Sequence, residues 1–314
     1  MKLKQIGEFG LIKRIYKKSK DQNILVGIGD DTAVIKFGNK LMLITTDTIV
    51  EGDHFSFKYF TPEQVGKKAI EINVSDIGSM GGIPKYALVS LVLPKELNVD
   101  IIDRIYKGMR ESGNKHKVEI VGGNITHGKE LVIDIDMIGE VKKENLCLRS
   151  HAKPGDFILV SGDLGSSTAG LNLFLKKIKG HDEVKKKHLE PKAKTKKIKP
   201  FIKYINAMID VSDGLASEVK HICNQSNVGA IIYKNNIPIK DNTRKAAKAL
   251  KTNAADYALY GGEDFELVYT VSEKNLNKVK GYLVGEITKR KGVYLYEKGK
   301  EKLIIKKGYD HFKV

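Results

Sequence analysis

Apolar segments of strand length alternate with helical segments along most of the chain, which limits the fold to the classes that combine helices with sheets. The clearest strand is residues 41–46, and Thr61 followed by Pro62 marks the start of a helix. We therefore predict an α/β (α+β) protein. The predicted helices cover residues 9–18, 61–80, 99–115, a stretch after 165, and 213–224. The predicted strands cover residues 33–37, 41–46, 86–93, 118–121, 131–141, 157–161, 207–211, 265–271, 283–288 and 292–296.

The chain is long enough for two domains. Its 314 residues exceed one ordinary domain of roughly 150 residues. A turn-rich segment at 151–156 separates the two runs of elements. We predict an N-terminal domain over residues 1–148 and a C-terminal domain over residues 149–314.

No segment of the sequence is typical of export or membrane insertion. No apolar run reaches the roughly 18 residues that a membrane helix needs, and the first eight residues lack a secretory signal. Cys147 and Cys223 form no CxxC pair, and such isolated cysteines are more often inert buried residues than a disulfide or a metal site. We expect a cytoplasmic protein with no membrane partner.

The net charge of +17 makes a nucleic-acid partner worth weighing. Much of the excess lies in residues 176–199, where lysines occur with few aromatic residues that could stack on bases. Lysine also outnumbers arginine, the residue that reads base edges best. We interpret the segment as a solvated face and predict no nucleic-acid partner, although a basic nucleic-acid-binding protein remains a remote alternative.

Carboxylates collect where this basic chain has few lysines. Residues 41–57 contain three acidic residues and no lysine or arginine, and a turn just upstream contains Asp30 and Asp31. The buried strand 41–46 would deliver Thr45, Thr46 and Asp47 at its C-terminal end, where α/β proteins bind ligands. Adjacent carboxylates need a compensating cation, and Mg²⁺ prefers oxygen ligands. Asp47 alone would serve equally well as a turn cap.

Asp76 is placed on the apolar face of a predicted helix. Val65, Ala69, Ile72 and Asp76 are separated by four, three and four positions, which puts them on one stripe. An unpaired buried charge costs several kcal/mol, so this carboxylate needs a lysine, an arginine or a metal ion nearby. We favour a metal ion.

The C-terminal half contains a similar arrangement. Asp210 lies in an apolar strand, where aspartate is rare, and Ser212 and Asp213 follow at the start of a helix. Amides of such a turn can hold phosphate, although Asp213 could also be an ordinary helix cap. The glycine pairs 122–123 and 261–262 flank predicted strands and are weak signals singly. The sequence lacks the phosphate-loop and dinucleotide-binding fingerprints.

Taken in order, these segments resemble the thiamine-monophosphate kinases, and the resemblance covers nearly the whole chain. The matching stretches are residues 7–12, 27–34, 45–55, 73–82, 122–124, 209–216, 260–267 and 308–312. This family belongs to the superfamily of aminoimidazole ribonucleotide synthetase. The resemblance implies the two-domain fold of that superfamily, a homodimer whose N-terminal domains form a β-barrel, and a C-terminal α/β domain. It also implies ATP-dependent phosphorylation of thiamine monophosphate to the diphosphate, assisted by several Mg²⁺ ions.

The resemblance also implies roles for particular residues. Magnesium would be held by Asp30, Thr45, Thr46, Asp47, Asp76, Asp210 and Asp213. ATP would be bound by Asp30, Thr45, Tyr106, Gly123, Asn124, Arg149 and Ser212. Thiamine phosphate would be bound by His54, Glu263 and Tyr309. The catalytic residues would be Asp210, Asp213 and Arg149.

One position departs from the family pattern. Asn124 stands where many members carry aspartate, which lowers the local negative charge and leaves the number of metal ions open. Aminoimidazole ribonucleotide synthetase remains the alternative activity within the superfamily. Selenophosphate synthesis fits poorly because no cysteine precedes Cys147, and hydrogenase maturation fits poorly because the chain does not end in cysteine.

Overall fold

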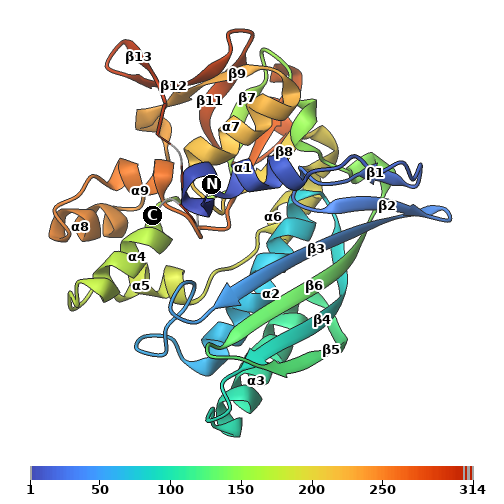
Figure 1. Cartoon of the computed structure of the whole chain (residues 1–314). Coiled ribbons are helices and arrows are strands. Elements are labelled where there is room, and N and C mark those ends of the chain that lie inside the picture. The colour runs from blue at the N-terminus through green and yellow to red at the C-terminus, as the bar shows by residue number, and fades with distance from the viewer. Residues whose placement is uncertain (1, 307, 310–311, 313–314) are drawn as a thin grey trace.

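The computed structural model describes residues 2–306, 308–309 and 312, and it contains two mixed layers of helix and sheet. Figure 1 shows one sheet with helices α2 and α3 packed behind it, and a second sheet with its own helices above. The first sheet is built from residues 24–141 and the second from residues 157–303. The predicted boundary at residue 148 lies between them and stays a prediction. Within the described residues no helix is both long and apolar enough to cross a membrane.

The first sheet has six strands in the order β1-β2-β3-β6-β4-β5. All neighbours are antiparallel except β4 and β5, which run parallel. The sheet does not close on itself in the described chain, because β1 and β5 are its edges. The strands are β1 Ile24–Val26, β2 Ala33–Phe37, β3 Lys40–Val50, β4 Ile83–Leu93, β5 Glu119–His127 and β6 Val132–Val141.

Two long helices cover one face of this sheet. Helix α2 (Pro62–Ser79) begins as the sequence predicts: the Thr61 side chain accepts from the Gln64 amide at 3.3 Å, and Gln64 Oε1 accepts from the Thr61 amide at 3.0 Å. Helix α3 (Val99–His116) packs against it. Helix α1 (Leu3–Ile15) starts and ends earlier than the predicted 9–18, because Tyr16 is already extended.

The predicted strand 118–121 is too short. Strand β5 continues through Gly122, Gly123 and Asn124, which the sequence analysis placed after the strand. Glycine is tolerated here because β4 approaches closely: a Cβ at Gly123 would lie 1.8 Å from the Val89 carbonyl oxygen.

The second sheet has seven strands in the order β13-β12-β9-β11-β7-β10-β8. Strands β9 and β13 and helices α5, α6, α8 and α9 were not predicted. The strands are β7 Phe157–Val160, β8 Ala207–Asp210, β9 Gly229–Tyr233, β10 Leu267–Val271, β11 Tyr282–Thr288, β12 Gly292–Glu297 and β13 Lys300–Leu303. The helices are α4 Ser166–Leu175, α5 Asp182–Leu189, α6 Thr195–Ile198, α7 Leu215–Ser226, α8 Asp241–Ala249 and α9 Ala254–Tyr260. Short 3₁₀ turns lie at η1 Lys143–Asn145, η2 Arg149–His151, η3 Lys199–Tyr204, η4 Lys234–Asn236 and η5 Glu273–Lys278.

Most lysines of the segment 176–199 are exposed, as the interpretation as a solvated face predicts, but the segment also packs against the rest of the protein. It forms α5 and α6, and it buries Val184, His188 and Ile198 to within 3% exposure. Its backbone also bonds to the first domain, where the Ala193 amide donates to Glu71 Oε2 at 2.8 Å. The few apolar residues are enough to hold the segment against the protein, because the charged ends of the lysine side chains can remain in solvent.

Candidate active site

A cleft of about 470 Å³ opens between the two domains, and most of the predicted site residues line it. Its lining comes from the strand ends β3 and β8, from helix α2, and from the loop that precedes β10. The predicted residues in it are Asp30, Thr45, Thr46, Asp47, His54, Asp76, Arg149, Asp210, Ser212, Asp213, Glu263 and Tyr309. Asp310 and His311 of the C-terminal motif lie outside the described residues.

Three carboxylates from distant parts of the chain meet at the centre of this cleft. Asp31, Asp76 and Asp210 each place an oxygen within 4.8 Å of the other two. Asp31 was not among the predicted metal ligands, although it adjoins Asp30 in the same turn. The first two are partly buried, and Asp210 is 2% exposed.

Hydroxyl groups on neighbouring elements hold these carboxylates in place. Thr45 Oγ1 on β3 donates to Asp76 Oδ2 at 2.5 Å. Ser75 Oγ on α2 donates to Asp210 Oδ2 at 2.6 Å, which joins the two domains. Among the described residues, no lysine or arginine forms an ion pair with Asp76 or Asp210, and their hydrogen-bond donors are these neutral hydroxyls.

The cluster is short of positive charge. Burial, with Asp47, Asp210 and Asp31 adding to it, raises the pKa of Asp76 well above its usual range. Burial and then Asp31 do the same to the pKa of Asp210. Burial and Asp134 raise the pKa of Asp47 to about 7; Asp47 lies within β3, which continues to Val50 beyond the predicted end at residue 46. A divalent cation would relieve the cost of ionising these three buried carboxylates together.

Arg149 supplies the positive charge on one side of the cluster. Its guanidinium lies against both aspartates of the 30–31 turn: Nε is 3.4 Å from Asp30 Oδ1, and Nη2 bonds to Asp31. Burial opposes the charge on Arg149, but Asp31 and Asp30 raise its pKa. Burial and Asp31 raise the pKa of Asp30 to about 6. Arg149 therefore contacts both aspartates of the turn, and Asp31 lies in addition beside Asp76 and Asp210.

The turn between β8 and α7 presents Ser212 and Asp213 to the cleft. Gly214 follows with φ +105°, a conformation that favours glycine, and it precedes the first turn of α7. Buried Glu218 accepts from the Asp213 amide at 2.8 Å and so fixes the shape of the turn. Sequence reasoning missed Glu218, although an acidic residue near a helix start is a usual signal for such a bond.

The other side of the cleft is formed by His54, Glu263 and Tyr309, the residues predicted to bind the acceptor. His54 Nδ1 accepts from the Val50 amide at 3.2 Å. Glu263 lies in a loop with φ +65°, and its amide donates to the Ser212 carbonyl at 2.7 Å. Backbone hydrogen bonds therefore join the loop of Glu263 to the turn of Ser212.

Three predicted residues do not line this cleft. Tyr106 lies on α3, and Gly123 and Asn124 lie on the edge strand β5 with both of them exposed. The described part of one chain does not bring them to the aspartate cluster.

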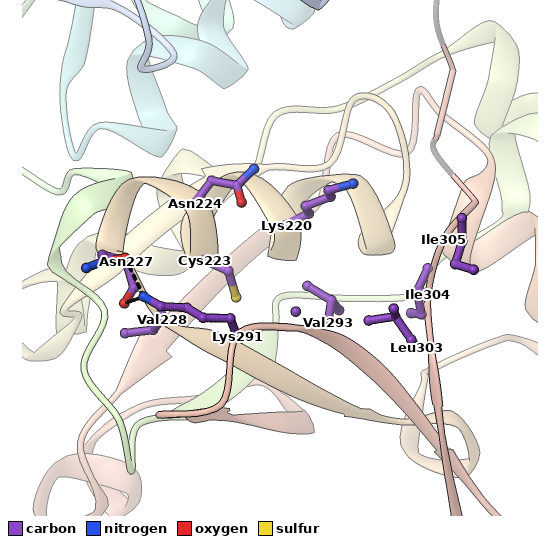
Figure 2. Close-up of a pocket in the computed structure, with 11 residues that line it drawn as sticks. Lys220, Cys223, Asn224, Asn227, Val228, Lys291, Val293, Leu303, Ile304 and Ile305 are labelled. Carbon is purple, nitrogen blue, oxygen red and sulfur yellow. Dashed lines mark hydrogen bonds between the residues drawn. The ribbon is translucent and has the colours of Figure 1, made fainter.

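Both cysteines are free and buried. Burial raises the pKa of each thiol to about 12, which leaves it unreactive at neutral pH. Cys223 lies beside a separate hollow of about 490 Å³ between α7 and the β12–β13 hairpin (Figure 2). Lys291 reaches across that hollow and bonds to the carbonyl and side-chain oxygens of Asn227. No predicted site residue lines it.

Comparison with known proteins agrees with the two-domain architecture. Residues 29–141 match the AIR synthase related protein, N-terminal domain, and residues 153–298 match the AIR synthase related protein, C-terminal domain. The thiamine-monophosphate kinase of Aquifex aeolicus (strain VF5) is 38% identical over 99% of this chain and 100% of its own length. The chain belongs to the thiamine-monophosphate kinase family. The family enzyme of Bacillus subtilis (strain 168) is 37% identical over 98% of this chain and 99% of its own length.

A solved structure of a family member matches the fold closely. The structure of AaThiL complexed with AMPPCP and TMP superposes with a TM-score of 0.90 at 36% identity, and the match covers 99% of each chain. The family resemblance drawn from the sequence motifs is confirmed, as is the two-domain fold of the AIR synthase superfamily.

Proposed function

We propose that this chain transfers the γ-phosphoryl group of ATP to thiamine monophosphate and forms thiamine diphosphate. The observation that carries the proposal is the meeting of Asp31, Asp76 and Asp210 in the same cleft as His54 and Glu263. A cluster that suits metal-bound phosphates thus lies beside residues matched to the family's acceptor site. Relatives with this name and a related structure holding an ATP analogue with TMP support the same activity.

The donor set fits Mg²⁺. Its side chains offer carboxylate and hydroxyl oxygens, and Asp76 and Asp210 have raised pKa values that a divalent cation would reverse. Asp31, Asp76 and Asp210 would hold metal, with Asp47, Asp30 and Asp213 close enough in the cleft to add ligands or to bind through water. When bound, Mg²⁺ would neutralise phosphate oxygens and stabilise the charge that develops during transfer.

The chain's own residues have little covalent chemistry to perform. The acceptor is a phosphate monoester with a second pKa of about 6, so it already carries a nucleophilic oxygen at neutral pH. Arg149 contributes a buried positive charge next to the cluster, and the Ser212 turn offers amides and a hydroxyl to a phosphate. Their task is to align two anions for in-line displacement.

We also propose that two copies of the chain join through strand β5. It is an edge strand of the first sheet, and Val121 and Ile125 on it are 59% and 67% exposed. Pairing of two such sheets would produce the barrel that the resemblance implies. It would also give Tyr106, Gly123 and Asn124 a nucleotide to contact, since these residues lie outside the cleft of their own chain.

The dimer proposal has a direct test. Ile125→Asp should shift the protein from dimer to monomer in analytical ultracentrifugation and weaken ATP binding. Phe37→Asp is the matched control, because Phe37 is 70% exposed but lies on β2, away from β5. A dimer that survives Ile125→Asp with unchanged sedimentation would rule out this interface.

The activity is tested with purified protein, ATP, Mg²⁺ and thiamine monophosphate, with chromatography to detect the diphosphate. Free thiamine and the substrate of aminoimidazole ribonucleotide synthetase serve as alternative acceptors. Asp210→Asn should reduce turnover by about a hundredfold or more in folded protein. ATP binding without any diphosphate product would refute the proposed acceptor. A cytoplasmic location, where ATP and Mg²⁺ are available, belongs to the same proposal.

A further inference from the structure

Glu263 lines the cleft on the side that we assign to the acceptor, and each of its carboxylate oxygens already has a basic partner in the protein. Lys68 Nζ lies 2.5 Å from Oε1, and His188 Nδ1 lies 3.3 Å from Oε2. Lys68 is 1% exposed and His188 is 3% exposed, whereas Glu263 keeps 29% of its side chain open. A carboxylate has about four lone-pair positions, so two partners leave room for a ligand.

The two partners come from separate parts of the chain. Lys68 lies on α2 of the first domain, and its Nζ is held in addition by the His54 carbonyl at 2.8 Å. His188 lies on α5, within the lysine-rich segment that follows α4 in the chain and packs against α2. Thr168 and Leu171 on α4 line the cleft together with His188, and Figure 1 shows α4 and α5 below α8 and α9. The segment thus contributes one buried imidazole to the acceptor side.

Packing fixes the orientation of this imidazole. Its ring touches Tyr59, Phe60 and Phe174, with ring centroids 5.3–6.5 Å away. Ser167 Oγ is 3.2 Å from Nδ1, while Nε2 is buried without a hydrogen-bond partner in the described structure. A ring enclosed in this way cannot turn freely, so Nδ1 stays directed toward Glu263.

We infer that His188 is a positioning residue that orients the Glu263 carboxylate toward the positively charged thiazolium ring of the acceptor. The inference rests on the proposed function and adds a residue and a segment to it. Lys68 engages Oε1 and so leaves the rotation of the carboxylate open, whereas the His188 N–H fixes Oε2 as well. A single fixed orientation lets the carboxylate meet the acceptor without an ordering cost at binding.

The test separates the donor of His188 from its bulk. His188→Phe keeps an aromatic ring but removes the N–H, and His188→Leu removes it with a smaller side chain. His188→Asn places an amide N–H near the position of Nδ1. Lys186→Ala on the same helix is the control, since the Lys186 side chain is 66% exposed and pairs with Glu190 instead of Glu263. Steady-state constants for thiamine monophosphate and for ATP are measured for each variant, together with thermal unfolding.

His188→Phe and His188→Leu should raise KM for thiamine monophosphate about tenfold, the effect of one hydrogen bond to a charged group. KM for ATP should stay within about twofold, and His188→Asn should recover most of the acceptor affinity. If a folded His188→Phe or His188→Leu variant has the wild-type KM for thiamine monophosphate, the inference is overturned while the proposed function stands. The same holds if KM for ATP and KM for thiamine monophosphate rise by the same factor. Absence of thiamine monophosphate turnover in the wild type would instead overturn the proposed function, and this inference with it.

Discussion

Glu71 on α2 joins helix α3 of the first domain to the lysine-rich segment of the second, and its neutralisation should destabilise the protein. The side chain is 4% exposed. Its Oε1 lies 2.8 Å from Lys115 Nζ, 2.9 Å from Ser112 Oγ and 3.0 Å from His116 Nε2 on α3. Its Oε2 accepts from the Ala193 amide of the lysine-rich segment at 2.8 Å. One carboxylate on α2 therefore anchors both the neighbouring helix and that segment.

The pKa of Glu71 gives the size of this effect. Burial opposes ionisation, but His116 and Lys115 outweigh it and lower the pKa from 4.5 to about 2. A lowering of about 2.5 units corresponds to about 3 kcal/mol of stability, present above pH 4.5 and lost as the pH falls toward 2. Glu71→Gln should therefore cost about 3 kcal/mol above pH 6 and only about 1.5 kcal/mol at pH 3.

Glu111→Gln provides a matched control on the same pair of helices. Glu111 Oε2 pairs with Lys67 Nζ at 2.7 Å, but the two side chains are 46% and 36% exposed. Such a surface pair contributes at most about 1 kcal/mol. Urea unfolding followed by far-ultraviolet circular dichroism suits this comparison, because the chain has no tryptophan. Equal losses for the two variants, or a Glu71→Gln loss that is the same at pH 7 and pH 3, would refute the reasoning.

Three further predictions concern the cleft and the packing of the helices. The raised pKa of Asp47, about 7, means that its ionisation costs folding energy as the pH rises from 3.8 through 7. Asp47→Asn should stabilise the magnesium-free protein by about 2 kcal/mol at pH 8, after allowance for the partial exposure of Asp47. Thermal unfolding measures this gain, which should disappear when Mg²⁺ is added. Arg149→Lys should lower kcat about tenfold or more in steady-state assays while the protein stays folded, since an ammonium cannot reach both aspartates as the guanidinium does. Gly66→Ala should lower the free energy of unfolding in urea by at least about 2 kcal/mol, because the new Cβ would lie 2.0 Å from the Ile105 carbonyl oxygen. The control Gly27→Ala should cost little, because its Cβ would lie 3.9 Å from the nearest neighbouring atom.

The parts of the site that depend on local pattern could be predicted from sequence. The apolar stripe of α2 indicated that Asp76 faces inward, and the strand pattern before Asp210 indicated a buried carboxylate at a strand end. Both aspartates meet in the cleft. Local periodicity is enough here because each side chain's direction follows from the element that carries it.

Residues whose roles depend on packing between distant segments were missed. Lys68 lies three positions after Val65 and four before Ile72, so it shares the apolar stripe of Asp76 and could have been identified by the same reasoning. The abundance of lysine in the chain concealed it. His188 gave a weaker signal, because α5 is short and its neighbours are mostly charged. Only the packed structure shows that this histidine, unlike the lysines around it, is buried.

The contacts between the two domains concentrate on the site itself. Ser75 on α2 bonds to Asp210 on β8, and Lys68 on α2 pairs with Glu263 in the loop before β10. Asp76 and Asp210 repel each other across the same boundary, since each raises the cost of ionising the cluster. The contact between the domains therefore holds together like charges that only a cation can compensate fully. Because a ligand that binds the folded chain stabilises it, Mg²⁺ with nucleotide should raise the thermal unfolding temperature, and Asp210→Asn should reduce that rise.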